Sequence, residues 1–210
     1  MRAEFYLENL IISEVYSTLK LCQLVIECTI ENEEIKRSVY GKIEAEIGDD
    51  ALLTSNTSAI PISELQKLTQ KPDRFFGLHW AEPSHTTRFL EIICGDQSDI
   101  TKGEYLYELS HGWGKEPTLV RKDIRGFIAN RLMYAMYREA FYLVENGYAT
   151  VEDVDRACRN NTGYWMTLVG VFGWMDLTGV PAYHNVMKDL NGTLYNGTEM
   201  PKLIDDIVKS

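Results

Sequence analysis

The sequence lacks any cluster of lysine and arginine. Its 210 residues carry 21 basic and 31 acidic side chains, and the net charge is −10. Proteins that bind nucleic acid gather positive side chains against the phosphate backbone, and no segment here does so. We therefore expect no nucleic-acid partner. The acidic balance itself favours solubility and says little about function.

Long hydrophobic runs are also missing. A helix that crosses a bilayer needs about 20 consecutive apolar residues, and the sequence has no such stretch. The N-terminal segment MRAEFYLENL is interrupted by Glu4, Glu8 and Asn9, so it does not resemble a secretion signal. These absences predict a cytoplasmic protein with no membrane partner.

Cysteine is scarce, and its spacing is uninformative for metal binding. The four cysteines, at positions 22, 28, 94 and 158, form no Cys-x-x-Cys pair, which argues against a zinc site. Most of them lie in apolar runs, where a buried, reduced thiol is the usual state. The sequence thus predicts no metal and a reducing compartment.

Short apolar runs and helical segments alternate through the first 120 residues. Strands are predicted at 21–28, 51–56, 74–80, 89–95 and 117–122, and helices at 1–20, 35–48, 61–70 and 97–114. Asn32 is a candidate N-cap for the helix that follows the first strand. Unbroken apolar strands alternating with helices are typical of an α/β fold with a mostly parallel sheet.

The pattern changes after Asp123. Apolar residues recur at helical spacing through 126–147, and further helices are predicted at 151–160 and 165–190. The last of these should kink or break near Gly173 and Gly179. The sequence therefore predicts an α/β domain over residues 1–120 and an all-α domain over residues 121–210.

A histidine and an acid lie within two successive predicted strands. His79 ends the run RFFGLHW, and Glu91 lies inside FLEII. If the two strands are neighbours, Glu91 can accept a hydrogen bond from Nδ1 and leave Nε2 free as a general base. The alternative is a buried histidine bonded to a backbone carbonyl, with Glu91 at a solvated edge. Spacing alone leaves both interpretations open.

Two further polar residues occur at junctions. Ser58 lies in SNTSAIP, between a strand and a helix start, where its hydroxyl could hold a substrate or cofactor oxygen or could cap the helix. Asn130 lies in the apolar segment GFIANRL, where its amide either faces a polar ligand or faces solvent. Neither pair of alternatives is resolved by the sequence.

Six segments in order resemble the 3-hydroxyacyl-CoA dehydrogenase family, and the resemblance runs from about Leu21 to about Val180. They include LVIECTIENEEIK, SNTSAIPISEL, RFFGLHW-AEP, FLEII and GFIANRL. The resemblance implies NAD as cofactor and oxidation of the 3-hydroxyl of a 3-hydroxyacyl-CoA to a ketone, in β-oxidation or butyrate metabolism. It also implies a Rossmann-type domain followed by a helical domain that commonly forms a homodimer.

Residue roles follow from the same resemblance. His79 matches the catalytic base and Glu91 the carboxylate that orients it. Ser58 matches a serine that touches the substrate oxygen and the nicotinamide side, and Asn130 an asparagine that helps hold the reacting oxygen. Cofactor-contacting positions are matched by Glu31 and Lys36.

Two departures from the family pattern bear on function. The family begins with a GxGxxG loop that seats the pyrophosphate, and the only Gly-x-Gly here, at Gly112 and Gly114, lacks its surroundings. We therefore expect the Rossmann-like domain to be partial. The family's HxxNP turn reads HWAEP here, so Glu82 replaces an asparagine that contacts the nicotinamide. A carboxylate cannot donate as an amide does, so Glu82 would either favour the cationic, oxidised ring or bind a different group.

The leading hypothesis is a 3-hydroxyacyl-CoA dehydrogenase with a small-molecule substrate. Two alternatives stay open: a truncated, non-catalytic paralogue that dimerises or binds acyl-CoA, and a related dehydrogenase of a non-CoA 3-hydroxy acid. An incomplete sheet would also expose an edge, so association is expected through that edge or through the helical domain.

Overall fold

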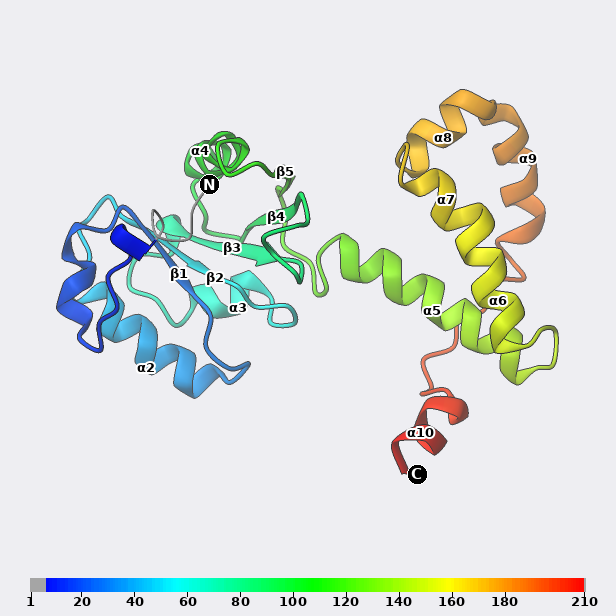
Figure 1. The fold of residues 1–210 in the computed structure, drawn as a ribbon, viewed down its shortest axis with the longest axis horizontal. Helices are drawn as coiled ribbons and strands as arrows, with labels where there is room; N and C mark the ends of the chain where they lie inside the picture. The colour runs from blue at the N-terminus through cyan, green and yellow to red at the C-terminus, as the bar shows by residue number, and fades with distance from the viewer. Residues whose placement is uncertain (1–6, 210) are drawn as a thin grey trace. The chain divides into compact units, whose positions relative to one another are not determined.

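The computed structural model describes residues 7–209, which form two compact units (Figure 1). The first unit ends at Ala129 and the second begins at Asn130. The first is α/β and the second all-α, which confirms the predicted fold class. The domain division predicted at residue 120 stays a prediction, and the last strand of the first unit ends there, at Val120.

Five strands form one sheet in the first unit. In spatial order they are β1 (Leu24–Glu27), β2 (Leu52–Ser55), β3 (Phe75–Trp80), β4 (Phe89–Cys94) and β5 (Glu116–Val120). Neighbouring strands are parallel except β3 and β4, which are antiparallel. Within the described residues, β1 is an edge strand with β2 as its one neighbour. The mostly parallel sheet predicted from the sequence is therefore present.

The sheet carries a hydrophobic core on each face. Leu53 and Phe75 pack with residues of α2 (Glu33–Glu44) and α3 (Ile62–Gln66). Their chain neighbours Leu52 and Phe76 pack on the other face with α4 (Ile100–His111), which covers that side in Figure 1. Because successive side chains of a strand point to opposite faces, burial on both sides requires the unbroken apolar runs seen in the sequence.

The predicted N-cap of α2 is present, whereas the predicted N-terminal helix is not. Asn32 caps α2, because its side chain accepts a hydrogen bond of 3.0 Å from the Ile35 amide. The helix predicted over residues 1–20 is wrong where the chain is described: only the 3-10 helix η1 (Tyr16–Leu21) is substantial, and residues 10–15 are not helical. Residues 1–6 lie outside the described residues. Branched side chains at 11, 12 and 15 disfavour a helix there.

The second unit consists of short helices. They are α5 (Ala129–Glu145), α6 (Val151–Ala157), a π-helical turn η3 (Cys158–Thr162), α7 (Gly163–Met166), α8 (Val171–Thr178), α9 (Val180–Leu190) and α10 (Lys202–Lys209). The break predicted near Gly179 is present, where φ is +107° between α8 and α9. Gly173 instead lies inside α8, because a single glycine is tolerated within a helix.

Burial differs sharply between the two units. The first has two buried clusters, whereas within the described residues 130–209 no residue is buried. Across residues 7–209, none of the helices combines the length and apolarity needed to span a bilayer. The helical unit in this single chain therefore has apolar side chains without a core of its own.

Two glycines test the packing of the first unit. A Cβ at Gly77 would lie 2.8 Å from the Cδ1 atoms of both Ile62 and Ile93, whereas a Cβ at Gly41 in α2 would meet nothing within 4 Å. We expect Gly77→Ala to lower the free energy of unfolding by about 1–3 kcal/mol through overpacking. Gly41→Ala should raise it by about 0.5–1 kcal/mol through helix propensity.

Urea unfolding of both variants beside the parent chain measures these changes. Shifts of the same sign in the two variants would contradict the described packing around β3.

Candidate functional site

His79 and Glu91 are direct cross-strand partners in the antiparallel pair β3–β4. The Nδ1 atom of His79 lies 2.9 Å from Oε2 of Glu91. Glu91 is 1% exposed and His79 is 7% exposed. The alternative in which Glu91 sits at a solvated edge is therefore excluded, and the hydrogen bond predicted between the two side chains is present.

The second oxygen of Glu91 is held by the backbone. Oε1 accepts hydrogen bonds from the amides of Ile128 (3.0 Å) and Ala129 (2.9 Å), at the start of α5. Burial acts to raise the pKa of Glu91, but the hydrogen bonds from His79, Ala129 and Ile128 outweigh it and bring the pKa below its ordinary value. Glu91 is thus ionised at neutral pH.

An ionised Glu91 fixes the tautomer of the neutral imidazole. A carboxylate can only accept, so Nδ1 must carry the proton that bonds to it. The other ring nitrogen, Nε2, is then unprotonated and available to take a proton. This arrangement suits a general base, which needs a free nitrogen beside a group that stabilises the cation it becomes.

The rings of two phenylalanines pack against the imidazole of His79. The ring of Phe89 lies edge-on at 5.7 Å between centroids, and that of Phe127 lies at 5.4 Å. Phe127 is 1% exposed and has a φ of +51°, directly after Gly126 at +79°. A bulky residue in this left-handed region is strained, so the surrounding structure must hold it there. Reasoning from the sequence missed both rings.

Ser58 does not cap the helix that follows it. The helix α3 begins at Ile62, its N-cap position is Pro61, and that cap makes no side-chain hydrogen bond. Ser58 is exposed in the turn after β2, and its backbone amide donates to Oε1 of Glu31 at 2.7 Å. The capping alternative is therefore excluded, whereas contact with a substrate or cofactor stays a prediction.

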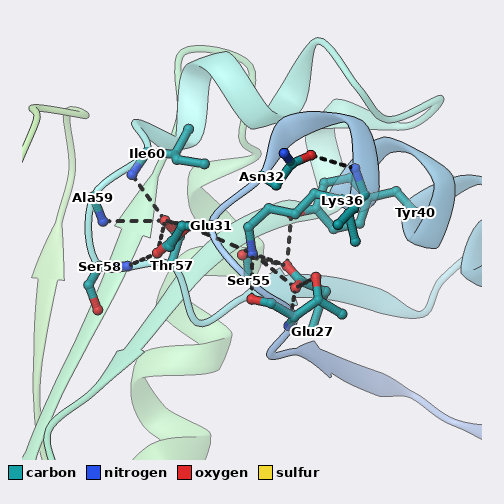
Figure 2. A network of polar contacts seen from close by, with 12 residues as sticks. Glu27, Glu31, Asn32, Lys36, Tyr40, Ser55, Thr57, Ser58, Ala59 and Ile60 are labelled. Atoms are coloured by element: carbon teal, nitrogen blue, oxygen red, sulfur yellow. Dashed lines mark hydrogen bonds and ion pairs between the residues drawn. The ribbon is translucent and has the colours of Figure 1, made fainter.

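Glu31 and Lys36 lie close together but in different environments. The side chain of Glu31 is 40% exposed, and that of Lys36 is 1% exposed. The ammonium of Lys36 donates to both oxygens of Glu27, at 2.9 and 3.0 Å (Figure 2). Lys36 is thus a buried partner of Glu27, and its predicted contact with the cofactor is not tested by the described residues.

Glu27 itself was missed by reasoning from the sequence, because it lies in the apolar run of β1. Burial acts to raise its pKa, but hydrogen bonds from Thr29, Ser55 and Lys36 overcome that effect, and the pKa lies below the ordinary value. An acid inside an apolar run, with a lysine nine residues later, was the available signal. It is the same kind of signal that identified Glu91.

Two predicted residues remain, Glu82 and Asn130, and Asn56 is a further polar residue at the same edge of the sheet. Glu82 is exposed in the loop between β3 and β4. Asn130 is half-buried and follows Ala129, whose amide holds Glu91. Asn56 accepts from the Trp80 amide at 3.1 Å, which ties the end of β2 to the end of β3. The roles of Glu82 and Asn130 stay predictions.

Glu31, Ser58 and His79 come from the carboxyl ends of β1, β2 and β3. In parallel α/β sheets this edge is where ligands bind. No group of three or more His, Cys, Asp or Glu side chains among residues 7–209 is placed to hold a metal ion. The edge therefore offers a buried imidazole, a hydroxyl and carboxylates as its chemical groups.

The sequence matches two family descriptions in succession. Residues 2–124 match the 3-hydroxyacyl-CoA dehydrogenase NAD binding domain, and residues 126–210 match the C-terminal domain of the same family. The match thus covers both units of the structure and nearly the whole chain.

Individual relatives agree with this match. The chain is 36% identical over 181 residues to a 5-formyl-3-hydroxy-2-methylpyridine 4-carboxylate 5-dehydrogenase of Mesorhizobium japonicum, covering 86% of the chain and 59% of the relative. It is 30% identical over 195 residues to a 3-hydroxybutyryl-CoA dehydrogenase of Bradyrhizobium diazoefficiens, covering 93% and 65%.

A solved structure is similar as well. The crystal structure of a 5-formyl-3-hydroxy-2-methylpyridine 4-carboxylic acid 5-dehydrogenase, an NAD⁺-dependent dismutase, superposes with a TM-score of 0.85 at 35% identity. The alignment covers 88% of this chain and 60% of that one. The chain therefore spans less than two thirds of the length of each of these relatives.

The lowered pKa of Glu91 predicts how stability depends on pH. A carboxyl with a folded pKa below its ordinary 4.5 stabilises the fold above that value, and the stabilisation is lost as pH falls through the folded pKa. We expect the free energy of unfolding of the parent chain to fall as the pH drops below 4.5, and to fall less steeply in Glu91→Gln.

Denaturant unfolding at each pH measures this dependence. Glu116→Gln, at an acid whose side chain is 65% exposed, is the control and should follow the parent. A Glu91→Gln profile parallel to the parent would contradict the proposed ionisation of Glu91.

Proposed function

The chain belongs to the 3-hydroxyacyl-CoA dehydrogenase family, and on that basis we propose that it takes part in NAD-dependent oxidation of the 3-hydroxyl of a 3-hydroxyacyl-CoA to a ketone. The observation that supports this most directly is the buried pair of His79 and Glu91, with 2.9 Å between Nδ1 and Oε2. Dehydrogenation of an alcohol requires a base for the hydroxyl proton, and this pair has the form of one.

The roles proposed for the residues combine the geometry of the His79–Glu91 pair with the resemblance to the family. His79 takes the hydroxyl proton on Nε2, and the resulting imidazolium is stabilised by Glu91, which the amides of Ile128 and Ala129 keep in place. When bound, NAD⁺ supplies the acceptor for the hydride that leaves C3 of the substrate. Ser58 and Asn130 are proposed to hold the reacting oxygen.

The fit of NAD to this chain can be judged from the polar side chains at the carboxyl edge of the sheet. The exposed Ser58, the 40% exposed carboxylate of Glu31 and the exposed Glu82 suit the nicotinamide and ribose side of the cofactor. Lys36 would act there through Glu31, because its own side chain is buried. The 210 residues contain no GxGxxG loop, so they offer no such cradle for the pyrophosphate.

A second candidate is a dehydrogenase of a non-CoA acid. Two observations favour it: the 36% identity to an enzyme named for a pyridine carboxylate, and the Glu82 turn in place of the family's asparagine. A third candidate is a non-catalytic paralogue that dimerises or binds acyl-CoA. Fatty acid metabolism as the setting belongs to the first candidate alone.

Turnover of matched variants tests these candidates. With NAD⁺ and 3-hydroxybutyryl-CoA, the parent chain should produce NADH, and Glu91→Gln should lower kcat by about 10²–10⁴-fold with little change in KM, because it weakens the base. Glu104→Gln, at an acid whose side chain is 50% exposed, is the control and should keep the parent rate.

Other outcomes separate the candidates. NADH formed from a free 3-hydroxy acid or from 5-formyl-3-hydroxy-2-methylpyridine 4-carboxylate, and not from the CoA ester, would favour the second candidate. A bound nucleotide at 100 times its Kd adds about 2.7 kcal/mol of stability. No thermal shift with NAD⁺ and no turnover would favour the non-catalytic paralogue, and equal rates for Glu91→Gln and the parent would refute the role of the pair.

We also propose a homodimer through the helical unit, in a reducing, cytoplasmic compartment. All four cysteines are free thiols, which fits that compartment. Phe172 and Leu177 of α8 are 80% and 71% exposed, and none of the described residues 130–209 is buried. About 80 ordered residues with little buried apolar surface do not readily offset their conformational entropy, so a second copy is proposed to cover them.

Sedimentation measures the oligomeric state. The parent should sediment at about twice its 24.1 kDa, and Phe172→Asp should shift it toward the monomer because a charge would be buried in the interface. Tyr105→Asp, at a 56% exposed residue of α4 in the first unit, is the control and should leave the dimer intact. A monomeric parent would contradict the proposal.

A further inference from the structure

The turn that carries Ser58 is held by a carboxylate from another element. Glu31, in the loop between β1 and α2, accepts from the Ser58 amide at 2.7 Å. The hydroxyl of Thr57 lies 2.9 Å from each oxygen of the same carboxylate. Figure 2 shows Glu31 beside the turn formed by residues 57–60, with its oxygens facing Thr57 and Ser58. Glu31 thus bridges two loops at the carboxyl edge of the sheet.

Thr57 also organises the turn from within. It is 1% exposed, and its hydroxyl oxygen accepts from the amides of Ile60 at 3.0 Å and Ala59 at 3.4 Å. Since the hydroxyl has one hydrogen and two lone pairs, it can donate to Glu31 while it accepts from the turn. One side chain therefore joins the backbone of residues 59–60 to the carboxylate that holds residue 58.

A buried ion pair lies behind Glu31. The Lys36 ammonium is 3.9 Å from Oε2 of Glu31 and is anchored on Glu27 at 2.9 Å. Glu27 also accepts from Tyr40 at 2.9 Å and Ser55 at 2.7 Å. Removing one member of a buried pair is costly because the other is left uncompensated, so Lys36 is held at one place. It offers Glu31 a fixed positive charge.

We propose that Glu31 and Thr57 are positioning residues for Ser58, and that the buried pair of Glu27 and Lys36 fixes Glu31. This inference rests on the proposed function, because Ser58 matters through its contact with the reacting oxygen. It gives Thr57 and Glu27 a role in the site, whereas the resemblance to the family gave a role to neither residue. In this proposal the carboxylate of Glu31 also holds the turn at residues 57–60 when no cofactor is bound.

Hydrogen–deuterium exchange of the purified 210-residue chain tests the first half of the proposal. Thr57→Val removes the bond to Glu31 and the acceptor for the turn while keeping the side-chain shape. We expect the Ser58 and Ile60 amides to exchange at least about tenfold faster, since hydrogen bonds to charged groups protect by that order. Thr57→Ser should restore protection, because it restores the hydroxyl.

Thr54→Val is the matched control. Thr54 is fully buried in β2, and its hydroxyl donates to the Val25 carbonyl at 3.1 Å, away from the turn. It should lower stability without selective exchange at residues 58–60. If Thr57→Val does not fold, Glu31→Ala at the partly exposed acid carries the same expectation for the Ser58 amide. Equal exchange in the Thr57 or Glu31 variant and the control would overturn the proposal.

The second half is tested by the neutral double variant Glu27→Gln with Lys36→Met. It removes both charges of the buried pair together and leaves neither one uncompensated, so the fold should persist. We expect the Ser58 amide to exchange several-fold faster, because Glu31 loses its fixed counter-charge. Protection equal to that of the parent would show that the buried pair does not fix Glu31.

Ser58→Ala separates this inference from the proposed function. The variant keeps its backbone amide, so protection at residue 58 should stay at the parent level while turnover falls. Unchanged turnover with the exchange results as expected would refute the role of Ser58 in the reaction and leave the positioning contacts standing. Parent-like exchange in Thr57→Val with lost turnover in Ser58→Ala would refute the positioning contacts alone.

Discussion

The buried carboxylate of Glu91 is the constraint on which the rest of the site depends. It lies in the middle of the sheet, where an unpaired charge would be prohibitively costly. Two backbone amides and one imidazole supply its hydrogen bonds, and together they bring three separate segments to one point. The position of His79, the path of the chain after Gly126 and the start of α5 follow from satisfying this one acid.

Glu27 shows the same physical solution on β1, three strands away from Glu91 in the sheet. Both acids lie in apolar strands, and each is kept ionised by donors that outweigh the cost of burial. Their partners differ in kind. Glu91 accepts hydrogen bonds from one imidazole and two backbone amides, whereas Glu27 accepts from one ammonium, three hydroxyls and one backbone amide. Glu91 therefore supports the role proposed for His79, and Glu27 supports the proposed fixing of the loop that carries Glu31.

The sequence predicted the sheet, the capping of α2 by Asn32 and the partnership of His79 with Glu91, because each depends on local spacing or on strand pairing. It did not predict the contacts of Phe127, Ile128 or Thr57. Phe127 contacts His79 because its backbone adopts a left-handed conformation that a phenylalanine seldom adopts. In the neighbouring sequence, only Gly126 indicates such a conformation. The helix expected at the start failed because branched residues interrupt it.

Holding Glu91 through the main chain also shapes what mutation can do to this protein. Every non-proline residue carries the same N–H group, so the side chains of Ile128 and Ala129 can change without touching the bonds that orient the acid. These two positions will therefore look permissive in a comparison of sequences, although the path of their backbone is indispensable. Proline would be the exception, because it alone lacks the N–H group and would remove one of the two backbone hydrogen bonds that hold the Glu91 carboxylate.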